Sequence, residues 1–202
     1  MAHDVRLTEL SRSIAGRIAI ITGAASGMGR ATAHLFADEN AKVVVADLGA
    51  DRVQTVVAEI EAVHGADGVL GVVCDVADPE QLRALVDATI ERFGGIDIVV
   101  NNAGVAMPNS LFEVDDMFES QWATTLDVNL TAHARLVRYA LPSLLESDSA
   151  RVVNIASTEA IVTTAGAAAY SATKAGVVGL TKSMAVELGR HGVTANCICP
   201  GP

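Results

Sequence analysis

Basic residues are scarce in this chain of 202 residues. Fourteen lysines and arginines stand against 24 aspartates and glutamates, so the formal net charge is −10. A nucleic-acid partner is therefore not expected, because phosphate backbones are bound by basic surfaces. The charge does not exclude a small anionic ligand, since backbone N–H groups can bind one without a basic side chain.

Long apolar runs and an even set of cysteines are also missing. Half of the residues are apolar, but no run approaches the length of about 20 residues that spans a bilayer, so no membrane partner is expected. The N-terminal stretch MAHDVRLTELSRSIAG lacks the apolar core of a secretory signal. The three cysteines indicate reduced thiols, and no Cys/His spacing predicts a metal. We therefore expect a cytoplasmic protein without a metal site.

The chain does contain a regular alternation of short apolar runs and amphipathic segments. Six runs rich in β-branched residues predict buried parallel strands at 17–22, 42–47, 68–76, 96–103, 151–157 and 193–199. The intervening patterns predict helices at 51–64, at 79–93 and from near Glu119 to near Leu145. This order predicts an α/β fold with a doubly wound parallel sheet and helices on both faces.

A glycine-rich turn follows the first predicted strand, in ITGAASGMGRATAHLF at residues 21–36. Gly23, Gly27 and Gly29 have a GxxxGxG spacing between a strand and a helix, which is the context of dinucleotide-binding turns. Glycines there let the backbone approach a pyrophosphate, and the N–H groups at the helix start attract the anion. Ser26 is a candidate N-cap or phosphate donor. The alternative is a turn whose glycines serve packing alone.

Carboxylates end the second and third predicted strands. Asp47 lies 18 residues after Gly29, where a carboxylate can accept hydrogen bonds from the adenosine ribose and repel a 2′-phosphate. Neither Ser26 nor Leu48 supplies a cation for such a phosphate, so NAD is favoured and NADP is less favoured. Asp75 is a candidate acceptor for the adenine amino group. Either aspartate could instead be a strand-end turn residue.

One of the two tyrosines lies in a run of small residues, AAAYSATKAG at 167–176. Tyr170 and Lys174 are at i and i+4 and therefore share one helix face. A free tyrosine has a pKa of about 10, and a nearby ammonium favours the phenolate form. The small neighbours leave room for a cofactor ring, so the pair is a candidate general acid/base with its tuning cation. A surface Tyr–Lys pair is the alternative.

Two further polar positions lie at a strand end and inside the long predicted helix. Ser157 follows the fifth predicted strand, 13 residues before Tyr170, where it can hold a substrate carbonyl or cap a turn. Asn129 is unfavourable inside a helix, because its amide competes for backbone hydrogen bonds. It either holds a water that links Lys174 to solvent or satisfies neighbouring backbone.

Several signatures occur in order from about Gly16 to the end of the chain: TGAASGMG, Asp47, NNAG, Asn129, Ser157, YSATK and PG. Together they resemble the short-chain dehydrogenase/reductase family. The resemblance implies a Rossmann-type sheet of order 3-2-1-4-5-6 and an NAD(P)-dependent oxidoreductase acting on a secondary alcohol or ketone. It implies the cofactor-binding residues Gly23, Ser26, Gly27, Met28, Gly29, Asp47, Asp75, Val76, Asn102, Ala103, Gly104, Tyr170, Lys174, Pro200 and Gly201.

The resemblance also implies a role for each of four catalytic residues. Tyr170 would be the general acid/base, and Lys174 would lower its pKa and contact the nicotinamide ribose. Ser157 would position the substrate, and Asn129 would complete a proton relay. Asn101, in NNAG, is assigned to the scaffold.

Members of the family usually continue beyond the PG motif, through a substrate lid and a seventh strand. We therefore expect residues 1–15 to be an N-terminal arm and residues 16–202 to be a dinucleotide-binding catalytic domain that is cut short at its C-terminal end. The leading hypothesis is an NAD-dependent dehydrogenase. The alternative is a truncated, catalytically idle nucleotide-binding or structural protein, and an epimerase or dehydratase is less favoured. Expected partners are a small-molecule alcohol or carbonyl substrate and further copies of the chain, in a homodimer or homotetramer.

Overall fold

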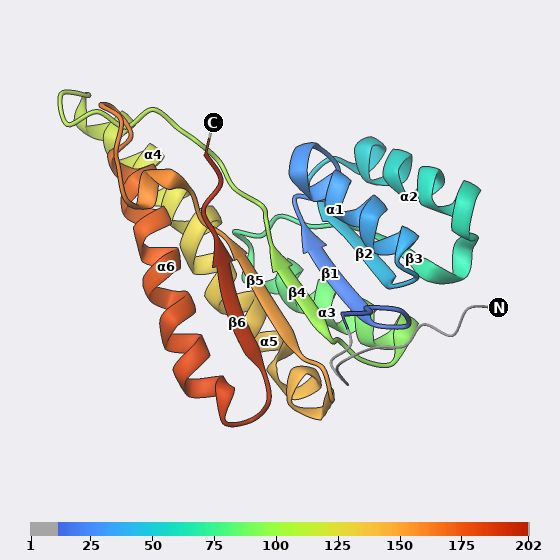
Figure 1. The fold of residues 1–202 in the computed structure, drawn as a ribbon. Coiled ribbons are helices and arrows are strands. Elements are labelled where there is room, and N and C mark those ends of the chain that lie inside the picture. Colours follow the sequence, from blue (N-terminus) through green and yellow to red (C-terminus); the bar gives the residue numbers. More distant parts are fainter. Residues whose placement is uncertain (1–11, 202) are drawn as a thin grey trace.

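The computed structural model describes residues 12–201 of the chain (Figure 1). Six parallel strands form one sheet in the order β3-β2-β1-β4-β5-β6, which confirms the predicted doubly wound fold and its strand order. Each strand lies within one of the predicted runs. The strands are β1 (Ile18–Thr22), β2 (Lys42–Asp47), β3 (Val69–Val73), β4 (Ile98–Asn101), β5 (Arg151–Ile155) and β6 (Thr194–Ile198). Most of the expected N-terminal arm, residues 1–11, lies outside the described residues.

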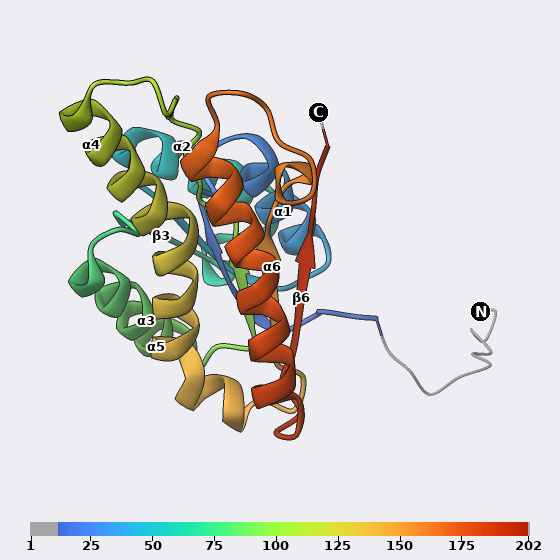
Figure 2. The ribbon, with the colours of Figure 1, turned by 90° about the vertical axis from the view of Figure 1, so that its left-hand side faces the viewer.

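Helices form two layers, one on each side of the sheet (Figures 1 and 2). On one side are α1 (Gly27–Asp38) and α2 (Ala50–His64). On the other side are α3 (Pro79–Phe93), α5 (Ala132–Glu146) and α6 (Ala168–Gly189). Helix α4 (Asp115–Leu126) runs into α5 and packs beside α6. Three short turns complete the list: η1 (Ala66–Gly68), η2 (Asp127–Thr131) and η3 (Thr158–Ala160).

The central strands are buried on both faces, which explains the high apolar content of the chain. All five residues of β1 are buried. Ile20 packs into the core beneath α3 and α5, whereas Ala19 and Ile21 pack into the core beneath α1 and α2. Alternate side chains of a strand point to opposite faces, so each central strand contributes to both cores.

The β6 edge of the sheet is covered on one face only within the described residues. Ala195 is buried on the α6 side, while Thr194, Asn196 and Ile198 point away from it and are exposed. Helices cover both faces of the sheet as predicted, and among the described residues the layer of α1 and α2 does not extend over β6. The sheet in Figure 1 accordingly has α6 on one side of β6 alone.

Helix ends carry residues that cap or stop helices. Asp78 caps α3 by accepting from the Glu80 and Gln81 N–H groups, and Pro79 occupies the first turn. Gly94 ends α3 with a φ of 91°, and Gly65 ends α2 with a φ of 79°, a backbone region that favours glycine.

The long predicted helix is longer and less regular than its sequence pattern indicates. It begins at Asp115, four residues before the predicted start near Glu119, and it contains the π-helical turn η2 between α4 and α5. Apolar periodicity locates a helix face and says little about its first turn, which explains the shifted start. Within residues 12–201, no helix has both the length and the apolar character needed to cross a bilayer.

Candidate active site

The first strand leads into a glycine turn at the carboxyl edge of the sheet. Gly23 and Gly27 have φ values of 63° and 52°, which side chains rarely tolerate. At Gly29, in the first turn of α1, an added Cβ would lie 2.1 Å from the Gly23 carbonyl oxygen. Ser26 is the N-cap of α1, and its side chain makes no capping hydrogen bond. Two glycines in the first turn of α1, and an N-cap serine whose hydroxyl makes no capping hydrogen bond, fit the binding of a pyrophosphate.

Asn102 fastens this turn to the end of β4. Its Nδ2 donates to the carbonyl oxygens of Thr22 at 2.9 Å and of Gly23 at 3.1 Å. The neighbouring Asn101 is buried and donates to Asn154 Oδ1 at 2.8 Å. The two asparagines thus connect the ends of β1, β4 and β5 at the edge where ligands bind in such sheets.

Asp47 ends β2 with its carboxylate turned toward the glycine turn. Its Oδ2 accepts from the Ala25 N–H at 3.1 Å, and its Oδ1 lies 3.2 Å from Arg52 Nη2. The Asp47 side chain is 10% exposed, whereas the Arg52 side chain is 62% exposed. A cation therefore lies beside the carboxylate on which the NAD prediction rests. Sequence reasoning considered only Ser26 and Leu48 and missed Arg52, which the first turn of α2 brings back toward β2.

Asp75 has a local role in the turn after β3. Its Oδ1 accepts from the Ala77 N–H at 2.9 Å, and its own N–H donates to Gln81 Oε1 at 2.9 Å. This is the turn arrangement that the sequence left open beside adenine recognition. Asp75 also lines the cleft described next, and its role toward adenine stays a prediction.

Two adjoining hollows run along the carboxyl edge of the sheet. The larger has a volume of about 580 Å³ and the smaller about 380 Å³. They share lining residues that include Met28, Asn102 and Gly104, and so form one continuous cleft. Every predicted site residue lines one hollow or the other, except Gly29 and Asn129. Within residues 12–201, no cluster of His, Cys, Asp or Glu is arranged to hold a metal ion.

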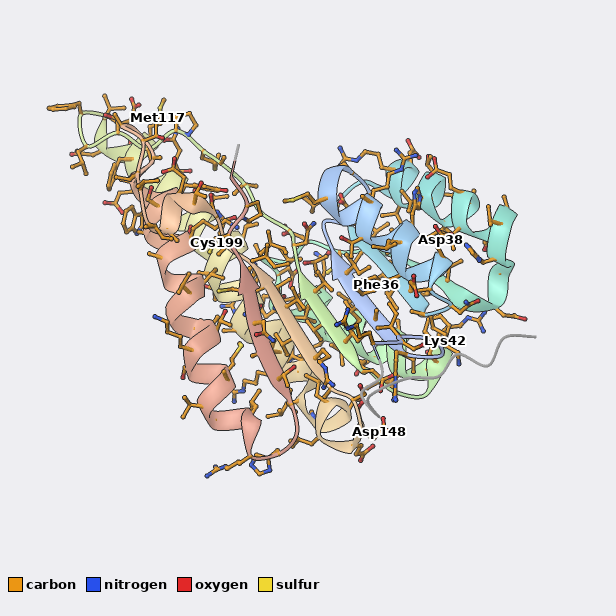
Figure 3. All side chains as sticks on the ribbon, viewed as in Figure 1. Phe36, Asp38, Lys42, Met117, Asp148 and Cys199 are labelled. Atoms are coloured by element: carbon orange, nitrogen blue, oxygen red, sulfur yellow. The ribbon has the colours of Figure 1, made fainter. Side chains whose placement is uncertain are left out.

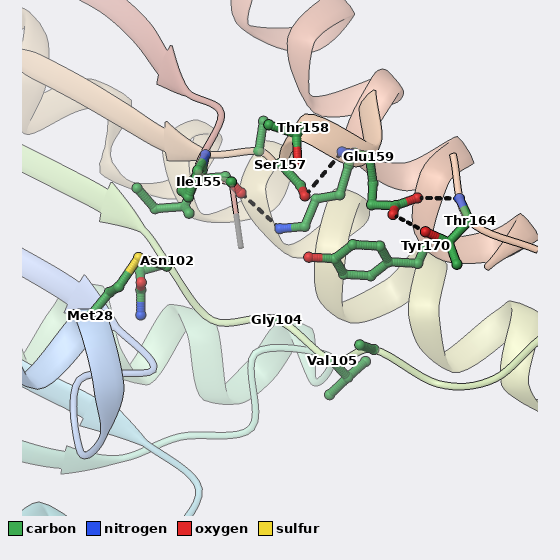
Figure 4. Close-up of a pocket in the computed structure, with 15 residues that line it drawn as sticks. Met28, Asn102, Gly104, Val105, Ile155, Ser157, Thr158, Glu159, Thr164 and Tyr170 are labelled. Atoms are coloured by element: carbon green, nitrogen blue, oxygen red, sulfur yellow. Dashed lines mark hydrogen bonds between the residues drawn. The ribbon is translucent and has the colours of Figure 1, made fainter. Parts of the chain in front are cut away.

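Tyr170 and Ser157 meet in the larger hollow (Figure 4). Tyr170 lies in the first turn of α6, and its hydroxyl end points into the hollow, toward the side on which Ser157 lies. Ser157 Oγ accepts from the Glu159 N–H at 3.2 Å. Because that bond uses an oxygen lone pair, the hydroxyl proton of Ser157 remains available to a substrate oxygen.

Lys174 is buried beneath the tyrosine and is 3% exposed. Its Nζ donates to the Ile155 carbonyl oxygen at 2.7 Å and lies 5.6 Å from the centre of the Tyr170 ring. Burial lowers the pKa of Lys174 to about 8, since desolvation disfavours the charged form. The pair is therefore part of the cleft, and the alternative of a solvated surface pair does not hold for the lysine.

Asn129 is fully buried in η2, behind the cleft. Its Oδ1 accepts from the Val105 N–H at 2.8 Å, and its Nδ2 donates to the Val105 carbonyl oxygen at 2.8 Å. The amide therefore holds the loop that follows NNAG. A Cβ on Gly104 would lie 3.4 Å from Asn129 Oδ1 and 3.6 Å from Lys174 Nζ, so this loop passes against both residues. Pi-helical turns are frequent at functional sites, and the proton-relay role of Asn129 stays a prediction.

Pro200 and Gly201 contribute to the wall of the larger hollow. The Thr158 N–H donates to the Pro200 carbonyl oxygen at 2.9 Å, which holds the segment after β6 beside the residue that follows Ser157. The approach of these two residues to the cofactor, which the resemblance implies, stays a prediction.

His133 is a buried titratable residue that sequence reasoning missed. It lies one turn after Asn129, in α5, and is 1% exposed. Burial, and then the charge of Lys174, lower its pKa to about 3, so the imidazole is neutral at pH 7. The surrounding sequence, TAHARL, gives no signal that this histidine is inside.

The fold and the cleft together define a dinucleotide-binding α/β protein of the Rossmann type, with a Tyr–Lys–Ser set beside the binding edge. The sequence profile of short chain dehydrogenases matches residues 17–202. The chain belongs to the short-chain dehydrogenase family, whose members are oxidoreductases that bind a nicotinamide cofactor.

Curated relatives cover nearly the whole chain. The chain is 42% identical over 188 residues to the (2S)-[(R)-hydroxy(phenyl)methyl]succinyl-CoA dehydrogenase subunit BbsD of Thauera aromatica, an alignment that covers 93% of this chain and 73% of that protein. It is 36% identical over 189 residues to the 3-oxoacyl-[acyl-carrier-protein] reductase FabG of Vibrio cholerae, covering 94% and 74%. It is 38% identical over 184 residues to FabG of Staphylococcus aureus, covering 91% and 73%.

Proposed function

We propose that the chain is an NAD-dependent oxidoreductase that interconverts a secondary alcohol and a ketone. The observation that supports this most is the meeting of Tyr170, Ser157 and the buried Lys174 in one hollow, next to the glycine turn. Two hydroxyls beside a fixed cation suit proton transfer to or from the oxygen of an alcohol or ketone. A nicotinamide bound along the cleft supplies the hydride chemistry.

Tyr170 and Ser157 have different roles toward the substrate oxygen. Ser157 donates its hydroxyl proton as a hydrogen bond to that oxygen and fixes its position. Tyr170 gives the oxygen a proton during ketone reduction and takes one during alcohol oxidation. The hydroxyl end of Tyr170 points into the hollow that Ser157 also lines, which supports this pairing.

Lys174 acts by charge and by hydrogen bonding. An ammonium has three N–H donors, and the Ile155 carbonyl oxygen uses one of them. The others are free to hold ribose hydroxyls of the cofactor, which would align the nicotinamide with the substrate. Its positive charge lies 5.6 Å from the centre of the Tyr170 ring, beside the proposed site of proton transfer.

NAD is the proposed cofactor, on the basis of Asp47. A carboxylate that is mostly buried at the end of β2 suits a ribose diol and opposes a 2′-phosphate. We expect NADH to bind at least about tenfold more tightly than NADPH, a difference of about 1.4 kcal/mol, in a fluorescence titration.

Arg52 makes this prediction sharper, because it is the cation nearest to that carboxylate. Asp47→Ala should tighten NADPH binding, since it removes the repulsion and releases Arg52 for the phosphate. Arg52→Ala should weaken NADPH binding further and leave NADH binding within about threefold. Equal affinities of the unaltered protein for the two cofactors would contradict the assignment.

The substrate is proposed to be a small alcohol or carbonyl compound, and the names of the relatives suggest where to look. BbsD is named as a dehydrogenase of a hydroxyacyl-CoA and FabG as a reductase of 3-oxoacyl groups. A screen of secondary alcohols, ketones and 3-oxoacyl thioesters, followed by NADH absorbance, should find turnover. NADH binding without turnover of any compound would favour the idle nucleotide-binding alternative.

We further propose that the chain assembles as a homodimer or homotetramer. Helix α4 buries only Thr125 among its twelve residues, and exposed side chains of α6 include Ala172, Ala175 and Val186. Such surfaces favour helix packing between copies. Light scattering after gel filtration should give twice or four times the chain mass, and a monomer at micromolar concentration would contradict this proposal.

A further inference from the structure

Glu159 links Ser157 to the residue that follows Tyr170, through contacts that the proposed function does not use. Its backbone N–H donates to Ser157 Oγ at 3.2 Å. Its carboxylate reaches forward to the start of α6, where Oε2 accepts from Ser171 Oγ at 3.0 Å. Ser171 is the residue after Tyr170. One residue therefore contacts Ser157 through its main chain and the immediate neighbour of Tyr170 through its side chain.

The same carboxylate holds the loop between β5 and α6. Oε2 accepts from the Thr164 N–H at 3.0 Å, and Oε1 accepts from Thr164 Oγ1 at 2.6 Å (Figure 4). Thr163 Oγ1 lies 2.6 Å from Ser171 Oγ, which closes the network. These hydrogen bonds, chiefly those from Thr164, hold the pKa of Glu159 below its usual value, so the carboxylate is ionised at neutral pH.

Main-chain hydrogen bonds hold the loop at its two ends: the Val162 N–H donates to the Thr158 carbonyl oxygen at 3.0 Å, and the Asn109 N–H donates to the Gly166 carbonyl oxygen at 2.7 Å. Residues 161–166 are all exposed, so no buried side chain anchors them. Ile161 is 81% exposed and Val162 is 67% exposed. A segment without buried contacts opens easily, and charge-assisted hydrogen bonds are the strongest polar restraint available to it. Glu159 thus adds a side-chain tie between the Ser157 region and the first turn of α6.

We propose that Glu159 is a positioning residue that latches the β5–α6 loop and fixes the Ser157 hydroxyl relative to the Tyr170 hydroxyl. The latch consists of Glu159, Thr164 and Ser171. The proposal rests on the proposed function, in which these two hydroxyls act on one substrate oxygen. Proton transfer is sensitive to such spacing, because donor and acceptor must lie within hydrogen-bond reach.

The test measures steady-state kinetics and backbone hydrogen exchange on the same variants. Glu159→Ala should lower kcat at least tenfold, while KM and the NADH dissociation constant change less than about threefold. Ser171→Ala removes the hydrogen bonds of Ser171 Oγ with Glu159 and Thr163 but keeps those between Glu159 and Thr164, so it should lower kcat by a smaller factor. Glu159→Gln keeps one side-chain oxygen that can accept from the Thr164 N–H. Its kcat should therefore lie between that of Glu159→Ala and that of the unaltered protein.

Matched controls remove a glutamate carboxylate and a serine hydroxyl from α6 at positions away from the cleft. Glu187→Ala and Ser183→Ala alter exposed side chains of this helix that lie outside the cleft, and both should retain kcat. Because Glu159→Ala removes several hydrogen bonds, the milder Ser171→Ala also guards against a result caused by misfolding. A kcat that falls equally in the controls would overturn the assignment.

Hydrogen exchange reports on the latch without any turnover. Amides in peptides that span 159–171 should exchange at least tenfold faster in Glu159→Ala, while peptides of β1 and α1 should not change. Unchanged exchange would refute the latch, and faster exchange with normal kcat would refute the positioning role.

If the unaltered protein shows no turnover, the proposed function fails and the positioning role fails with it. The exchange result then still decides whether the latch exists.

Discussion

Lys174 is an ionisable residue in the protein interior, where an unpaired charge is unfavourable. It is 3% exposed, its Nζ donates a hydrogen bond to the neutral carbonyl of Ile155, and it forms no salt bridge with any of residues 12–201. A buried ammonium paired only with dipoles costs folding free energy, because water solvates it better. Such a cost is expected where a residue serves chemistry rather than stability.

The pH dependence of stability should reveal this cost. The pKa of Lys174 falls from 10.5 to about 8 on folding, so between these values the unfolded chain binds more protons than the folded one. Stability therefore rises with pH across that window. Between pH 7 and pH 9.5, urea unfolding should show the protein gaining about 2 kcal/mol relative to the Lys174→Met variant.

An exposed lysine provides the comparison. Lys182, on the exposed side of α6, gives the variant Lys182→Met, whose stability relative to the unaltered protein should not change with pH. If Lys174→Met and Lys182→Met behave alike, the ammonium of Lys174 is not desolvated in the way that its burial indicates.

At the scale of elements, the strand–turn–helix unit at the start of the domain is the most constrained part of the cleft. A Cβ on Gly29 would meet the Gly23 carbonyl oxygen at 2.1 Å and Asn102 Nδ2 at 2.5 Å. Neither atom can yield, because the first is main chain and the second is tied to the carbonyl oxygens of Thr22 and Gly23. The unit therefore couples the glycine turn to the end of β4.

Gly29→Ala should consequently reduce both stability and cofactor affinity. Overpacking of this kind costs about 1–3 kcal/mol, and displacement of the turn should weaken NADH binding at least tenfold. Thermal unfolding and fluorescence titration measure the two effects. Gly95→Ala is the control, since nothing lies within 4 Å of its added Cβ, and it should be neutral or slightly stabilising. Normal NADH affinity in Gly29→Ala would contradict the pyrophosphate cradle.

Local signals predicted the elements well, and non-local contacts account for what they missed. The caps of α3, at Asp78 and Gly94, could be read from the sequence because capping depends on neighbouring residues. The π turn at Asn129 could not be read, since it lies where α4 and η2 pack against α6. Arg52 was missed because it reaches Asp47 across a helix turn rather than along a strand.

At the scale of the whole molecule, the parallel arrangement of the strands is what brings the site residues together. Right-handed crossovers place the carboxyl ends of the strands at one edge, so motifs far apart in the chain arrive together. This is why most of the residues that the family resemblance assigned to one site, from Gly23 to Gly201, line a single cleft. The tie between Glu159 and Ser171 could not be predicted, because it depends on the path of an exposed loop with no regular pattern.

The central claim is that Tyr170 transfers the proton to or from the substrate oxygen. Tyr170→Phe removes only the hydroxyl, and Tyr139→Phe makes the same change in the other tyrosine, which packs against Arg83 away from the cleft. For any substrate that the protein accepts, Tyr170→Phe should lower kcat by about 10²–10⁴-fold, since general acid/base catalysis is worth that much. NADH should bind both variants within about threefold of the unaltered protein. A Tyr170→Phe variant that retains the kcat of Tyr139→Phe would contradict the account.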